Sequence, residues 1–214
     1  MLTVFYAAKG GQGVTTLVAG LVAVEDGPLV IDAAGDLLAA LGLAEPAGPD
    51  LAGLLASGDP IEADALIEAA EAIPGLPVVP SGGPLDEFEP ARWIDLASAL
   101  AADRRHWIVD AGAGPASAMV AVADRSFLVT RNCYLALRHA TRLTIRPTGI
   151  VLIREPHRPL HDRDIERVVG APVIATVEVD SRIARATDAG LVTARVPNGL
   201  QRALAGLIPH PTGR

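Results

Sequence analysis

Residues 2–16 read LTVFYAAKGGQGVTT, and this stretch decides the fold. It opens with an apolar run, Leu2–Ala7, passes through a loop rich in glycine, and leads into the helix-like run Val14–Val24. A strand, a glycine-rich turn and a helix in this order form an anion site, because the N–H groups of the turn converge and the helix N-terminus adds positive potential. The stretch therefore predicts a phosphate loop over residues 8–15.

This phosphate loop fits the frame G-x-x-x-x-G-K-[ST] only in part. Gly13 and Thr15 fit it, whereas Ala8 stands in place of the first glycine and Val14 in place of the lysine. Thr15 can still offer a hydroxyl to Mg²⁺, but Val14 brings no charge to the β- and γ-phosphates. Lys9 is the single lysine of the chain, since 17 of the 18 basic residues are arginine. Its place in the loop favours a functional role over an isolated lysine on a surface turn.

The rest of the chain alternates short apolar runs with amphipathic or alanine-rich stretches, a pattern typical of a parallel sheet with helices on both faces. The expected strands are 2–7, 28–32, 76–79, 106–110, 126–130, 149–153 and 172–177. The expected helices are 14–24, 61–72, 91–102, 134–143, 162–169, 181–189 and 200–207. We therefore predict a single doubly wound α/β domain over residues 1–208 and a flexible tail over residues 209–214. Its ligands should bind at the carboxyl ends of the strands.

Composition limits the classes of function. Half of the 214 residues are hydrophobic, and the formal net charge of −7 argues against a protein that coats nucleic acid with its whole surface. Cys133 is the single cysteine, so no intramolecular disulfide and no cysteine cluster for a metal can form. The chain starts on a strand-like run and has no apolar stretch long enough to span a bilayer. We expect a cytoplasmic protein.

The segment KGGQGVTT, residues 9–16, resembles the deviant phosphate loop of the MinD/ParA family of P-loop ATPases. In that family the early lysine reaches across a dimer interface to the nucleotide of the partner. The resemblance therefore implies a homodimer with Lys9 at the interface, and ATP and Mg²⁺ as cofactors. The second lysine of the family would stand at position 14, where this chain has Val14. Its loss should weaken nucleotide binding and the stabilisation of the transferring phosphoryl group.

Two further segments resemble the MinD/ParA family, and both are predicted strands that end in an aspartate. The run LVID ends at Asp32, where the family has an aspartate, and the run WIVD ends at Asp110 and resembles the Walker B strand. The alternative is that these aspartates only cap strand ends or make buried hydrogen bonds. The resemblance places the following residues at the nucleotide: Lys9, Gly10, Gly11, Gly13, Thr15, Thr16, Asp32 and Asp110, with Thr15, Asp32 and Asp110 as the ligands of Mg²⁺.

Other positions depart from the family. Its second acidic residue would fall on Ala34, its adenine-reading asparagine on Ile153, and its late proline on Glu178. Together with Val14, these changes remove side chains from the phosphate, water-activating and base-binding parts of one pocket. We therefore expect weak or absent ATP hydrolysis.

Three functions follow from the sequence. The first is a dimerising scaffold or spatial regulator for positioning, partition or pilus assembly, which most resembles the CpaE/TadZ branch of the family. The second is a working ATPase in which Lys9 or a displaced arginine replaces the missing lysine. The third is a dinucleotide-binding oxidoreductase, because Gly11-x-Gly13-x-x-Thr16 approaches G-x-G-x-x-G and Asp32 lies at a strand end where a ribose-binding acid belongs.

A basic stretch that includes Arg138 and Arg142 is a candidate DNA-binding patch. Members of the ParA kind bind DNA nonspecifically through scattered basic residues, which is what the resemblance implies for these two arginines. We favour the simpler interpretation, a solvated helix face.

Overall fold

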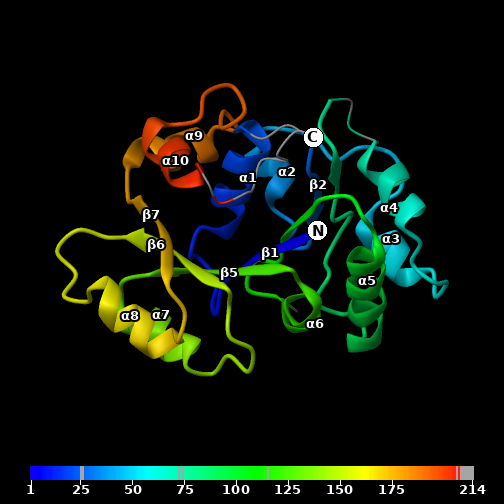
Figure 1. The fold of residues 1–214 in the computed structure, drawn as a ribbon. Helices are drawn as coiled ribbons and strands as arrows, with labels where there is room; N and C mark the ends of the chain where they lie inside the picture. The colour runs from blue at the N-terminus through cyan, green and yellow to red at the C-terminus, as the bar shows by residue number, and fades with distance from the viewer. Residues whose placement is uncertain (25–26, 72, 74, 115, 206, 208–214) are drawn as a thin grey trace, which may run out of the picture.

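The computed structural model describes residues 1–24, 27–71, 73, 75–114, 116–205 and 207. Seven strands form one sheet in which every pairing is parallel (Figure 1). The strands are β1 (Leu2–Tyr6), β2 (Leu29–Asp32), β3 (Val78–Val79), β4 (Trp107–Asp110), β5 (Arg125–Arg131), β6 (Gly149–Arg154) and β7 (Val173–Glu178). All seven predicted strands are confirmed, with ends that shift by one or two residues. The predicted tail 209–214 lies outside the described residues.

The helices confirm the predicted alternation but differ in number and length. They are α1 (Val14–Val24), α2 (Leu37–Ala40), α3 (Leu51–Ala56), α4 (Ala63–Ala70), α5 (Pro90–Ala102), α6 (Ala116–Val122), α7 (Tyr134–Ala140), α8 (Asp162–Val169), α9 (Ser181–Asp188) and α10 (Asn198–Leu204). The sequence prediction missed α2, α3 and α6. It was also wrong in extending a helix to residue 143, because α7 ends at Ala140 and the chain turns there. No helix among the described residues is both long and apolar enough to cross a membrane.

The sheet separates two apolar layers because successive strand residues face opposite sides. Val4 and Tyr6 of β1 belong to the cluster that α3 to α8 cover, and Phe5 between them belongs to the cluster that α1, α2, α9 and α10 cover. Figure 1 shows these two groups of helices on opposite sides of the sheet. The core is built mainly from Ala, Val, Leu and Ile, as a composition with 3% aromatic residues requires.

The strand order is β3-β2-β4-β1-β5-β6-β7. In the dinucleotide-binding fold β1 lies directly beside β2, in the order 3-2-1-4-5-6. Here β4 lies between them, with Asp32 of β2 in register with Asp110 of β4. The topology therefore argues against the oxidoreductase interpretation, and it brings two predicted site residues side by side.

A backbone contact between two glycines locks the segment after α2 to the segment after α9. Gly42 and Gly190 have positive φ values of 74° and 63°, and a Cβ on either residue would overlap the backbone of the other. Gly190→Ala should lower the free energy of unfolding by about 2–4 kcal/mol, because it adds left-handed strain and a clash that backbone cannot relieve. Urea denaturation followed by circular dichroism measures this effect.

The matched control is Gly199→Ala. Gly199 lies inside α10 and a Cβ there meets nothing within 4 Å. The same substitution should therefore stabilise the protein by about 0.5–1 kcal/mol, because alanine is a better helix former than glycine. Equal effects at the two positions would contradict the close approach at Gly190.

Candidate functional site

The site lies at the carboxyl edge of the sheet, where β1, β2 and β4 end side by side. The phosphate loop leaves the end of β1 and leads into α1. Asp32 is the last residue of β2 and Asp110 the last residue of β4. The predicted residues are therefore brought to one place by the register of three parallel strands.

The loop's shape depends on glycine and on two anchors. Gly11 and Gly13 have φ values of 75° and 93°, which other residues rarely adopt. Gln12 is buried, and its Oε1 accepts a hydrogen bond from the backbone N–H of Arg131 at 3.1 Å. The N–H of Ala7 donates to the carbonyl of Gly112 at 2.7 Å. The backbone cradle of the phosphate loop is thus held by β5 on one side and by the loop after β4 on the other.

The two positions that carry lysines in the resembled loop behave differently. Lys9 is partly exposed, and its Nζ donates to the carbonyl of Gly10 at 3.1 Å. Val14 is 5% exposed and packs in the apolar cluster of α1, while it also lines the wall of the cleft described below. The phosphate loop therefore carries a partly exposed cation at Lys9 and a buried apolar side chain at Val14.

Asp32 is fixed by backbone donors. Its Oδ1 accepts from the N–H groups of Ala34 and Gly35 at 3.2 and 2.7 Å, and its Oδ2 accepts from the N–H of Leu37 at 3.0 Å. Burial raises the pKa of Asp32, and these three hydrogen bonds offset part of that rise. Asp32 shapes the turn into α2, as the capping alternative anticipated.

Asp110 keeps one carboxylate oxygen without a hydrogen-bond partner. Its side chain is fully buried, Oδ1 accepts from the N–H of Gly112 at 3.1 Å, and Oδ2 has no hydrogen-bond partner. Burial, with a smaller contribution from the neighbouring charge of Asp32, raises the pKa of Asp110 to about 7. The Thr15 hydroxyl faces this carboxyl and lowers its pKa, although no hydrogen bond between them meets standard geometry. Thr15 and Asp110 thus form a pair with unsatisfied coordinating capacity.

A cleft of about 680 Å³ opens at Thr15, whereas Asp110 is buried and does not line it. The phosphate loop, the turn after β2, the loop after β3 and residues 112–114 line it. Among its described lining residues Lys9 is the one cation, whereas Asp36, Glu45 and Asp86 supply three carboxylates, all exposed. The sequence prediction missed these three acids. Asp36 follows a strand end and could have been noticed, whereas Glu45 and Asp86 reach the cleft only through tertiary structure.

A second, smaller cleft of about 140 Å³ lies on the other side of the phosphate loop. Thr16 and Gly13 line it together with Ile153 and Glu178, two of the positions that depart from the resembled family. Arg131 also lines it, and its Nε is buried without a hydrogen-bond partner. The glycine loop therefore separates an acidic cleft from a largely apolar one.

The structure does not bring the candidate DNA-binding arginines to this site. Arg138 lies in α7 and Arg142 in the turn that follows the helix, so the two do not share one helical face as the sequence prediction assumed. Both are exposed.

No family model and no curated protein matches the chain. Solved structures do. A ParA family ATPase from Chlorobium tepidum is 21% identical with a TM-score of 0.71, and the match covers 95% of each chain. The septum site-determining protein MinD of Pyrococcus horikoshii, complexed with Mg-ADP, is 19% identical with a TM-score of 0.72, over 95% of this chain and 92% of that one. The McdA–ATP complex of Cyanothece is 19% identical with a TM-score of 0.68, over 95% and 96%. The chain therefore has the fold of the MinD and ParA ATPases.

Proposed function

We propose that this chain is a MinD/ParA-like protein with a degenerate nucleotide site, which acts as a dimerising scaffold or spatial regulator and hydrolyses ATP weakly or not at all. The observation that carries the proposal is the charge of the phosphate cleft. Val14 occupies the lysine position of the loop, and the described lining of the cleft contains three carboxylates and one lysine. A site that binds a triphosphate tightly needs more basic than acidic side chains around the phosphates.

The ligand class remains an adenine nucleotide with Mg²⁺. Two proteins of this fold were solved with Mg-ADP and with ATP. This chain keeps the glycine cradle, and the free Oδ2 of Asp110 beside Thr15 fits a hard cation that prefers oxygen ligands. Thr15 and Asp110 would hold Mg²⁺, and Asp32 lies next to Asp110 on the neighbouring strand. The ion would supply positive charge beside the phosphates. The glycine cradle and the two Mg²⁺-binding residues are therefore retained. The lysine charge that would bind the terminal phosphates within the subunit is lost, because position 14 is a valine.

Lys9 supports the interface part of the proposal. Its head group makes one hydrogen bond to its own loop and has no ion pair among the described residues, so it is available to another molecule. A second copy that faces this cleft would find Asp36, Glu45 and Asp86 around its own Lys9. Each subunit's Lys9 would then add a positive charge to the facing cleft, which lacks a lysine at position 14.

Lys9→Ala should reduce dimer formation at least about tenfold, since it removes the charge that offsets the carboxylates of the facing cleft. Sedimentation velocity with and without ATP and Mg²⁺ measures the dimer fraction, and phosphate release measures turnover. Arg138→Ala removes an equal charge away from the cleft and should leave the dimer unchanged. Wild-type turnover that disappears in Lys9→Ala would overturn the scaffold proposal.

One observation favours the alternative, a working ATPase. Arg131 lines the second cleft together with Thr16, its backbone N–H donates to Gln12 of the phosphate loop, and its Nε is buried without a hydrogen-bond partner, so it is a displaced arginine next to the loop. Its Nη1 is already 2.8 Å from Oε1 of Glu155, and this ion pair holds it on the apolar side of the loop. Turnover that survives Lys9→Ala but not Arg131→Gln would identify this second mechanism.

A further inference from the structure

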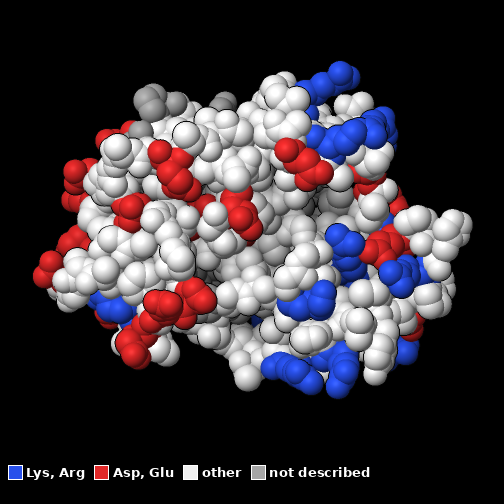
Figure 2. All heavy atoms as spheres, turned by 180° about the vertical axis from the view of Figure 1, so that it is seen from behind, with Lys and Arg blue, Asp and Glu red and all other residues white. Residues whose placement is uncertain are grey.

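Charge is divided unevenly along the chain. Residues 1–102 contain 15 acidic and two basic side chains, and residues 103–214 contain 10 acidic and 16 basic ones. The acidic helix α4 of the first half packs beside β3 and β2, whereas α7, α8 and α10 of the second half pack beside β5 and β7, at the other end of the sheet. Figure 2 shows acidic side chains gathered on one side of the molecule and basic ones on the other. The molecule is therefore an electric dipole along the width of its sheet.

The basic end carries a groove between α9 and α10. Arginines 182, 185 and 195 line this groove of about 400 Å³, and Ala186, Leu191 and Pro197 provide apolar surface. Arg182 is paired with Asp180 at 2.7 Å, but neither Arg185 nor Arg195 has an ion pair in the part of the chain that the structure describes. Leu191 is 55% exposed. Two free guanidinium groups over an apolar floor suit an acidic, partly apolar protein surface.

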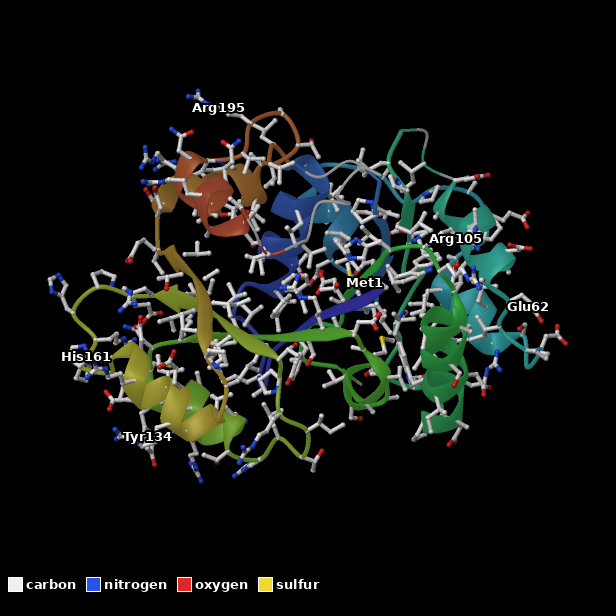
Figure 3. All side chains as sticks on the ribbon, in the orientation of Figure 1. Met1, Glu62, Arg105, Tyr134, His161 and Arg195 are labelled. Carbon is white, nitrogen blue, oxygen red and sulfur yellow. The ribbon has the colours of Figure 1, made fainter. Side chains whose placement is uncertain are left out.

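The acidic end carries a matching helix. Asp64, Glu68 and Glu71 follow one another at helical spacing along α4 and its C-cap, and all three are exposed. Asp64 is 3.7 Å from Arg105, whereas Glu68 and Glu71 have no ion pair among the described residues. Like charges at this spacing destabilise a helix by about 0.2–0.5 kcal/mol per pair, so a basic partner would relieve the repulsion between Glu68 and Glu71, which no ion pair among the described residues offsets. Glu62, the N-cap residue of α4, and Arg195 lie at opposite ends of the molecule (Figure 3).

We propose that the arginine groove of one copy binds the acidic face of α4 of a second copy, so that copies associate end to end. The groove and the helix lie at opposite ends of one molecule, and a contact between them is therefore heterologous and can repeat. Each added copy brings the same two complementary ends. Charge complementarity of this kind steers association and is screened by salt over about 8–10 Å.

Sedimentation velocity of the full chain over a range of concentrations tests the proposal. Species larger than a dimer should grow with concentration at about 50 mM NaCl and dissociate at about 500 mM NaCl. Arg185→Gln with Arg195→Gln should reduce the association constant at least about tenfold, and so should Glu68→Gln with Glu71→Gln. Arg138→Gln with Arg142→Gln removes the same charge outside the groove and should have no effect. These side chains are exposed and, within the described residues, unpaired, so circular dichroism should show an unchanged fold.

A mixture of the two defective variants sharpens the test. With Lys9→Ala added to both variants, which removes the proposed Lys9 interface, the groove variant keeps an intact α4 and the helix variant keeps an intact groove, so together they should form a one-to-one complex that grows no further. Lys9→Ala should leave this association unchanged, which separates it from the Lys9 interface proposed above. Salt-independent assembly, or a mixture that stays monomeric, overturns the proposal. So does loss of binding to duplex DNA or to anionic vesicles in the groove variant without any self-association of the wild type.

Discussion

Val14→Lys is expected to strengthen the binding of ATP with Mg²⁺ by about 10- to 100-fold, because a charged hydrogen bond to phosphate contributes about 1.5–3 kcal/mol. Val14 is the first residue of α1 and lines the cleft although its side chain is 5% exposed. A lysine there can bury its stem along the valine's contacts and extend its head group into the cleft of about 680 Å³. It would also offset one of the three carboxylates that now face Lys9.

Isothermal titration with ATP and Mg²⁺ measures the gain. Val14→Met is the matched control, since it lengthens the side chain without a charge and should leave the affinity unchanged. A similar gain in both variants would show that shape, and not charge, limits binding. Turnover should rise much less than affinity in Val14→Lys, because Ala34 leaves the cleft without the second acid that the resembled family carries.

The fold could be predicted because its signals are local. The buried strands are short, mostly apolar runs, and α1 and α8 have the predicted bounds. The missed helices lack such signals or depend on distant groups. α2 is four residues long and begins where Leu37 donates to Asp32, a contact made by the end of a strand. α3 had a readable start, since Asp50 caps it by accepting from the N–H of Gly53 at 2.7 Å.

The position of the site could be predicted because two of its residues lie at the ends of predicted strands. Asp32 and Asp110 end predicted strands, and a parallel sheet brings such ends to one edge. Their different roles could not be predicted, because they depend on which backbone donors reach each carboxyl. Asp32 receives three N–H groups, whereas Asp110 receives one and keeps Oδ2 free. The acidity of the cleft was also missed, since Glu45 and Asp86 come from segments with no motif of their own.

Asp110→Asn should stabilise the protein, and more so at alkaline pH. Burial raises the pKa of Asp110 from 3.8 to about 7, so between these values the folded state binds more protons than the unfolded chain. Stability therefore falls as the pH rises from about 4 to about 7, and stays at the lower level above that range. Asparagine keeps the acceptor for the N–H of Gly112 and removes a buried negative charge beside Asp32.

At about 1.4 kcal/mol per pKa unit, the advantage of Asp110→Asn should grow by roughly 2–3 kcal/mol between pH 5 and pH 8. Urea denaturation at both pH values gives the two differences in unfolding free energy. Mg²⁺ with ADP should stabilise the wild type at pH 8 and not Asp110→Asn, because the ion needs the ionised carboxyl that the substitution removes. If the unfolding free energies of wild type and Asp110→Asn changed in parallel with pH, burial would not raise the pKa of Asp110. The proposal that Asp110 and Thr15 form a retained Mg²⁺ site would then lose its main support.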